Sequence, residues 1–196
     1  MGLLASAALL ASHFVGRHSP SAGPASTVVR SFDSSRLPGV LTSPAPWGPN
    51  AAEVPRRLGV MGLPAGFGYT VHIHQHLDLF VDGTRVVVPS GIGIDPGGTF
   101  LAPLHTHDDT GIIHVESPVR RDYTLGEFFG VWGVRFTRRC LGGYCADPGR
   151  AFRLFVNGRR ILSDPTRLRL RQHEEIAIVV GGPVAVPSSY SFPPQD

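Results

Sequence analysis

The sequence predicts a mainly β fold, either a small antiparallel β-barrel or a β-sandwich, with one short α-helix. Apolar and polar residues alternate over residues 69–81, as they do in a strand that buries one face. Asp82-Gly83 and Asn157-Gly158 each follow an apolar stretch, and both dipeptides favour the type I′ turn of a β-hairpin. With 196 residues, 42% of them hydrophobic, the chain can build one sizeable core.

The chain divides into four expected segments. Residues 1–16 form an apolar run, which predicts a secretory signal peptide or a membrane anchor, with a disordered cytoplasmic tail as the alternative. Residues 17–65 are rich in Pro, Ser, Ala and Gly and predict a linker, from which Trp47 could dock onto the domain. A His-rich β domain is expected over residues 66–182, followed by a tail at 183–196.

A hairpin is expected around the turn sequence Asp-Asp-Thr-Gly at residues 108–111, because apolar runs flank it on both sides. If His107 pairs with Ile112, then His105 lies opposite His114, with Cβ atoms about 4.5–5.5 Å apart. This register places three imidazoles on one face of the sheet.

The only helical spacing that we identify lies in residues 123–132, where Thr124 and Glu127 have the spacing of a capping box. Beyond it, the hairpin sequence LFVDGTRV at 79–86 recurs as LFVNGRRI at 154–161, without histidines ahead of it. We therefore expect the first hairpin to carry the chemistry and the second to serve as scaffold, with a buried strand following near residues 175–181.

The charge and the cysteine content indicate which binding partners and which cellular compartment to expect. The net charge is only +3, all basic residues are arginine, and the arginine pairs are scattered without interleaved aromatic residues, so nucleic-acid binding is not expected. Cys140 and Cys145 flank a Gly-Gly turn and predict a disulfide loop, with a thiolate metal site as the alternative. Together with residues 1–16, they favour an exported protein, periplasmic, cell-surface or extracellular, that meets the membrane only through its N-terminal segment.

Six of the nine histidines fall in two short runs, mostly in His-x-His spacing. Alternate residues on a strand share a face, so such a pair can bring two imidazoles onto one ion. We expect Zn or Cu as the cofactor, since imidazole suits both. The inner set is expected to be His74, His76, His105, His107 and His114, with His72 as an outer ligand or half of a second site.

Two carboxylates near these histidines are candidate catalytic residues. Glu116 is predicted as a ligand, a general base or a surface charge, and these readings stay open. Asp108 is predicted either as a proton acceptor, as a carboxylate that orients a metal ligand, or as the residue that closes an Asx-turn.

The motifs HIHQHLDLFVDG, VPSGIGID, LHTHDDTGIIHVESP and YTLGEFFGVWG, in this order, resemble an exported or membrane-anchored bacterial His-rich β family of unestablished function. The resemblance covers residues 67–137 and implies no particular reaction. A weaker similarity is to cupins, whose His-x-His is matched by His105 and His107, while the glutamate of that motif is missing near Gly111. The spacing alone also matches the zinc ligands of α-type carbonic anhydrases.

Three classes of function remain from the sequence. The first is an extracytoplasmic protein that binds Cu or Zn without catalysis. The second is a metalloenzyme whose open three-histidine site activates water or O2 for a small-molecule substrate, in hydration, hydrolysis or oxidation. The third is a structural β module in which the histidines are hydrogen-bonded core residues.

Overall fold

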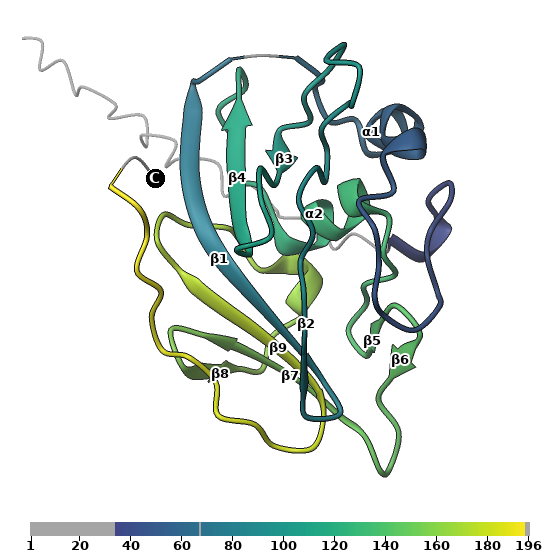
Figure 1. Ribbon diagram of the computed structural model, residues 1–196, viewed down its shortest axis with the longest axis vertical. Helices are drawn as coiled ribbons and strands as arrows, with labels where there is room; N and C mark the ends of the chain where they lie inside the picture. The colour runs from purple at the N-terminus through teal and green to yellow at the C-terminus, as the bar shows by residue number, and fades with distance from the viewer. Residues whose placement is uncertain (1–33, 67, 195–196) are drawn as a thin grey trace, which may run out of the picture.

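The computed structural model describes residues 34–66 and 68–194 (Figure 1). The helices are η1 (Ser34–Arg36), η2 (Ala51–Glu53), α1 (Val54–Met61), α2 (Leu125–Trp132) and η3 (Pro165–Arg167). The strands are β1 (Val71–Val81), β2 (Thr84–Val86), β3 (Leu104–His105), β4 (Ile112–Ser117), β5 (Cys140–Leu141), β6 (Tyr144–Cys145), β7 (Ala151–Val156), β8 (Arg159–Ile161) and β9 (Glu175–Gly181). The predicted β class is confirmed.

Seven strands form one sheet in the order β3-β4-β1-β9-β7-β8, with β2 paired to the second half of β1. All pairs are antiparallel except β1 with β9, which run parallel. The order begins and ends on unpaired edges, so the described strands do not close into the predicted barrel or into that of a cupin. A sandwich fits only loosely, because the second sheet is the two-stranded pair β5-β6.

Both predicted type I′ hairpins are present. Asp82 and Gly83 have φ of 46° and 86°, and Asn157 and Gly158 have φ of 49° and 73°. A type I′ turn needs positive φ at both central residues, which these pairs tolerate. The predicted disulfide is also present, since Cys140 and Cys145 are bonded across the β5-β6 hairpin.

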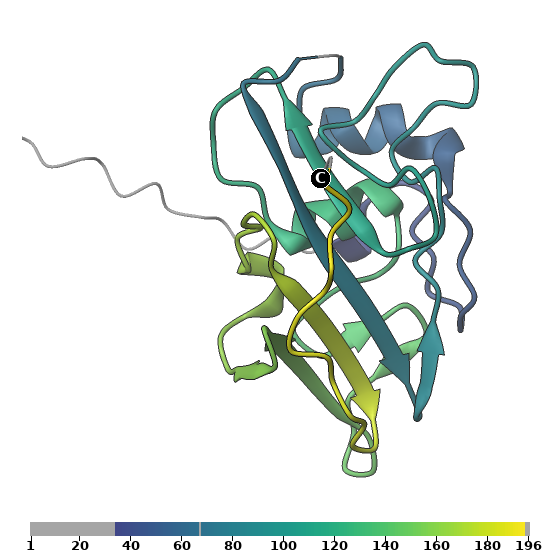
Figure 2. The same cartoon turned by 60° about the vertical axis from the view of Figure 1, so that its left-hand side comes forward.

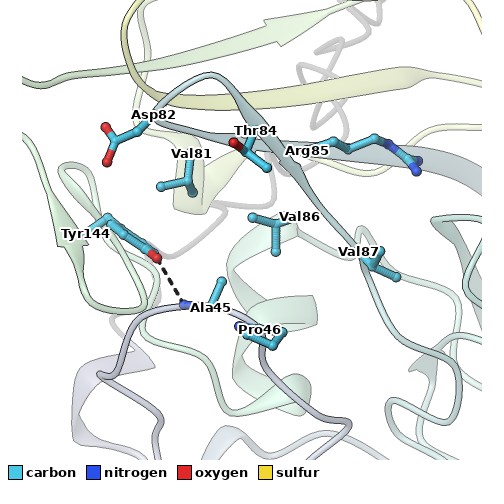
Figure 3. A pocket seen from close by; sticks show the side chains of 9 residues that line it. All are labelled: Ala45, Pro46, Val81, Asp82, Thr84, Arg85, Val86, Val87 and Tyr144. Carbon is cyan, nitrogen blue, oxygen red and sulfur yellow. Dashed lines mark hydrogen bonds between the residues drawn. The ribbon is translucent and has the colours of Figure 1, made fainter.

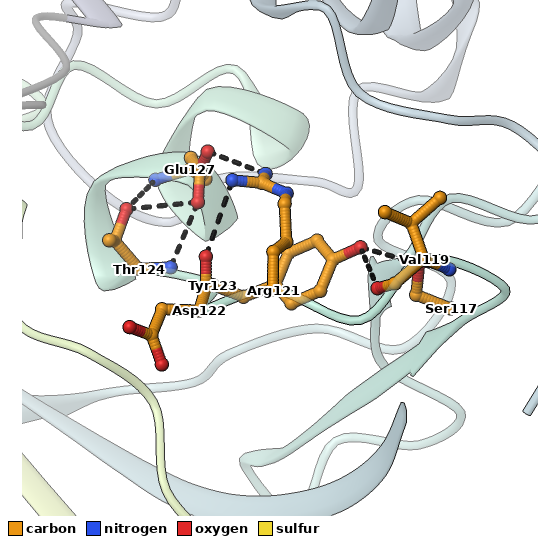
Figure 4. Close-up of polar contacts among 7 residues, drawn as sticks. All are labelled: Ser117, Val119, Arg121, Asp122, Tyr123, Thr124 and Glu127. Carbon is orange, nitrogen blue, oxygen red and sulfur yellow. Dashed lines mark hydrogen bonds and ion pairs between the residues drawn. The ribbon is translucent and has the colours of Figure 1, made fainter. Parts of the chain in front are cut away.

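Helix α2 packs its aromatic side chains into the core, as its apolar stripe predicts. Thr124 Oγ1 accepts the amide of Glu127 while Glu127 Oε2 accepts the amide of Thr124, so the predicted capping box is confirmed (Figure 4). Arg121 donates to Glu127 Oε1 at 2.7 Å, and the Tyr123 hydroxyl donates to Ser117 Oγ at the end of β4. These bonds fix the helix against the strand that carries His114.

The prediction of a linker at residues 17–65 is wrong for residues 34–65. This segment contains a second helix, α1, and it supplies core side chains spaced between its Pro and Gly residues: Leu37, Trp47, Val54, Leu58 and Leu63. Arg57 is fully buried and donates to the carbonyls of Val131 and Asn50, and burial lowers its pKa to about 10. Val54 and Leu58 have the i, i+4 spacing of a helix, but Pro55 and Gly59 lie beside them and weaken the helical signal of the sequence.

The expected signal or anchor at residues 1–16 lies outside the described residues. Within the described part of the chain, no helix is both long and apolar enough to cross a bilayer. The expected C-terminal tail packs onto the sheet instead of leaving it: Figure 2 shows it running back in front of β1 and β9, and Tyr190 stacks on His76 with ring centroids 3.8 Å apart.

Candidate metal centre

Strand β1 separates its two faces by strict alternation. Leu77 and Leu79 point into the core and are fully buried, whereas His72, His74 and His76 lie on the opposite face. The histidines therefore lie on the face of the sheet turned away from α2. The tail covers part of this face, where Tyr190 stacks on His76.

The pairing of β4 with its two neighbours brings the two histidine runs together. His114 lies opposite His74 on β1 and opposite His105 on β3, which confirms the predicted His105–His114 register. Glu116 lies opposite His72. Three adjacent strands thus supply donors to one patch, which we call the histidine cluster: His72, His74, His105, His107, His114 and Glu116.

The rings of the histidine cluster are in mutual contact around His114. The His114 centroid lies 4.5 Å from that of His74, 4.4 Å from that of His107 and 5.4 Å from that of His105. The His74 and His72 centroids are 4.7 Å apart. The donor atoms form two overlapping groups, each within 4.8 Å: His72, His74, His114 and Glu116, and His105, His107, His114 and Glu116.

Several donor–donor distances match the edge of a metal tetrahedron. Zn–N and Zn–O bonds of about 2.0–2.1 Å give a tetrahedral edge of about 3.3–3.4 Å. Glu116 Oε1 lies 3.3 Å from His72 Nε2, 3.7 Å from His114 Nδ1 and 3.8 Å from His105 Nε2. His105 Nε2 and His107 Nε2 are 3.2 Å apart. Small adjustments of the side chains would bring these atoms onto a cation.

Burial favours the neutral form of the imidazoles of His105 and His114. Burial, aided by the neighbouring His107, lowers the pKa of His105 to about 4 and the pKa of His114 to about 3. His105 Nδ1 donates to the carbonyl of Ala102 at 3.0 Å, which leaves the Nε2 lone pair directed at the cluster. His114 Nδ1 is buried without a hydrogen-bond partner among the described residues. Both rings are therefore ready to act as ligands.

His76 does not join the cluster, although the sequence predicts it there. Its Nδ1 lies 2.6 Å from Glu175 Oε2 on β9, and its Nε2 donates to the carbonyl of Thr110 at 2.9 Å. It forms a separate group with Asp78 and Glu175, in which Arg85 holds Asp78 at 2.7 Å and burial raises the pKa of Glu175. His72 joins the cluster instead, because it lies opposite Glu116 on β4, whereas His76 lies opposite Ile112 on β4 and beside Glu175 on β9.

The two predicted catalytic carboxylates are placed differently. Glu116 is buried between the imidazoles of the cluster. Asp108 is exposed and closes the loop as an Asx-turn, since its Oδ1 accepts the amide of Thr110 at 3.0 Å, and the hydrogen bond from the Thr110 hydroxyl lowers its pKa. Asp108 is in neither group of cluster donors.

Sequence reasoning missed the residues that support the cluster from a distance along the chain. Gln172 Oε1 accepts the amide of His74 at 2.7 Å, and the His173 amide donates to the carbonyl of His74 at 2.7 Å. The His-Glu-Glu sequence that leads into β9 at Glu175 is the only local signal that we identify for this segment. The partnership of Glu175 with His76 becomes visible only once β9 is known to pair with β1.

A pocket of about 420 Å³ lies at the other half of β1, between its hairpin with β2 and the segment around Pro46 (Figure 3). Its walls include Val81, Val86 and Tyr144, whose hydroxyl accepts the amide of Ala45 at 3.2 Å. None of the cluster histidines lines it. The histidine cluster is therefore the only described site at which metal-binding side chains of three strands converge.

Comparison with known proteins gives no independent assignment: no family model, curated protein or solved structure matches the chain.

Proposed function

We propose that this protein binds a transition-metal cation, Zn(II) or Cu(II), through the histidine cluster. The observation that carries the proposal is the convergence of five imidazoles and one buried carboxylate from three strands on one face of the sheet. Neutral imidazole is a preferred ligand of both ions. The donor spacings near the tetrahedral edge support the same conclusion.

A purely structural role for these histidines accounts poorly for their surroundings. A buried polar atom left without a partner costs about 1–3 kcal/mol, and His114 Nδ1 is such an atom. A bound cation would give His114 Nδ1 the partner that it lacks.

We also propose that the protein works outside the cytoplasm. The Cys140–Cys145 disulfide supports this location, since such bonds persist mainly in oxidising compartments. In such a compartment the exposed histidines at the rim, His72 and His107, would meet metal ions directly.

Metal titration of the purified chain tests the proposal. We expect wild type to bind Zn(II) or Cu(II) stoichiometrically after removal of bound metal by a chelator. His114→Ala should weaken binding by more than about 100-fold, the upper end of the effect of removing an outer-shell partner. Calorimetry and the metal content of dialysed protein give the readout.

Asp109→Asn is the matched control. Asp109 is exposed and belongs to neither group of cluster donors, so this change removes a nearby carboxylate without touching the cluster. This variant should bind like wild type. The absence of stoichiometric binding by wild type, or equal binding by wild type and His114→Ala, would contradict the proposal.

A further inference from the structure

We infer that the histidine cluster is a dinuclear centre, in which two cations share the Glu116 carboxylate. This inference rests on the proposed metal-binding function and specifies the number of ions and their ligands. One ion is assigned to the His72–His74 side of the cluster and the other to the His105–His107 side.

The first argument is the number of donors. The cluster offers six donor residues, whereas a tetrahedral ion takes about four. The donors form two groups of four that overlap at His114 and Glu116, rather than one group of six. A single ion in either group would leave two imidazoles of the other group without a metal.

The second argument is the position of the donors on the sheet. His72 and His74 lie on β1, His105 lies on β3 and His107 just follows it, while β4 runs between these strands. Adjacent strands are about 4.8 Å apart, so the two pairs approach the patch from opposite sides of β4. The middle strand supplies the two shared residues, His114 and Glu116.

The third argument is the position of the carboxylate. Glu116 Oε1 lies 3.3 Å from His72 Nε2 and 3.8 Å from His105 Nε2, so one oxygen already faces donors of both pairs. A carboxylate has two oxygens and can bridge two ions, which in dinuclear protein sites are about 3.5–4 Å apart. Glu116 is also the only acidic residue in either group, so it has no substitute in this role.

The fourth argument concerns asymmetry. His114 Nδ1 is buried and without a hydrogen-bond partner among the described residues, so it is available to complete the shell of one ion. That ion then has four protein ligands. Its neighbour has three and keeps a position open to solvent, the arrangement typical of a metal that binds an exogenous ligand.

The experiment is a Cu(II) titration of the metal-free full chain, followed by electron paramagnetic resonance and by equilibrium dialysis. We expect two equivalents to bind. The ions of a two-metal protein site are about 3.5–4 Å apart. Two Cu(II) ions bridged by one carboxylate at this separation couple magnetically, so the signal of isolated Cu(II) should fall as the second equivalent is added. Glu116→Gln should weaken this coupling.

Two double variants assign the ions to the two sides. His72→Ala with His74→Ala, and His105→Ala with His107→Ala, should each retain one uncoupled equivalent, while Asp109→Asn keeps two. Circular dichroism shows whether each variant folds, and the wild-type spectrum decides the question even if a double variant does not fold.

The alternative outcomes are distinguishable. One equivalent in wild type, abolished by either double variant, would overturn the dinuclear centre and leave the proposed metal binding intact. Two equivalents without magnetic coupling would place the ions apart and would also overturn it. Absence of binding would overturn the proposed function itself.

Discussion

The β1-β2 and β7-β8 hairpins have nearly the same sequence and the same turn, yet only one of them carries metal donors. Leu79 pairs with Val86 in the first hairpin as Leu154 pairs with Ile161 in the second. Strands β1 and β7 flank β9 (Figure 1). Leu79 and Leu154 both lie beside Ile178 of β9. The difference lies upstream of the shared motif, where β1 continues for several residues beside β4. The two hairpins are thus equivalent structural elements, and the metal donors lie on the part of β1 that precedes the shared motif.

The largest expected effect tests whether the two hairpins contribute equally to the core. Leu79 is 0% exposed and Leu154 is 2% exposed. Leu79→Ala and Leu154→Ala should each lower the free energy of unfolding by about 2–5 kcal/mol, because each leaves a cavity beside Ile178. Urea unfolding of the metal-free variants measures both losses. A large loss in one variant with almost none in the other would show that the two hairpins are not equivalent.

The second largest expected effect is the loss of folding stability in acid, which should come from the histidine cluster and not from the β7-β8 hairpin. His105 and His114 have pKa values lowered to about 4 and about 3, against an ordinary value of about 6.5. As the pH falls below about 6.5, the unfolded chain takes up protons that the folded chain does not. The metal-free protein should therefore keep its full stability above that pH and lose stability progressively toward about pH 4.

The double variant His105→Gln with His114→Gln supplies the comparison for acid stability. Its unfolding free energy should depend less on pH between about 4 and 6.5, because these two groups no longer titrate. Strands β7 and β8 contain no His, Asp or Glu, so the second hairpin adds nothing to this window. Equal slopes for wild type and the double variant would refute the assignment of acid sensitivity to the cluster.

The smallest effect distinguishes the two turns. Gly83 has φ of 86° and an added Cβ there would meet no atom within 4 Å, whereas at Gly158 it would approach Ser188 Cβ to 2.9 Å. Gly83→Ala should cost about 1–2 kcal/mol from backbone strain alone. Gly158→Ala should cost more, since the C-terminal segment must also shift. Thermal unfolding gives the ranking, and a reversed order would contradict this account.

Features governed by local sequence could be predicted. The I′ turns follow from Asp82-Gly83 and Asn157-Gly158, and the capping box follows from Thr124 and Glu127. The opposition of His105 and His114 follows from the strand period and a four-residue loop. Each of these depends on residues close together in the chain.

Features that depend on distant pairing could not be predicted. The parallel pairing of β1 with β9 places Glu175 beside His76, 99 residues away in sequence, and no strand period indicates which strands become neighbours. This pairing also explains why His76 binds Glu175 outside the cluster, while His72, expected only as an outer ligand, belongs to the cluster. The burial of Arg57 under α2 escaped prediction for the same reason, because its acceptor, the Val131 carbonyl, lies in a separate element.

Strand β3 is only two residues long and forms one outer border of the main sheet. A metal ion bound both by His105 on this edge strand and by donors on the inner strands would cross-link β3 to the rest of the sheet. At a free metal concentration about 100 times the Kd, such binding adds about 2.7 kcal/mol to folding stability. Loss of the metal should therefore open this edge of the sheet first, and hydrogen exchange of the Glu116 amide, which donates to the Pro103 carbonyl at 3.0 Å, would record the separation of β3 from β4.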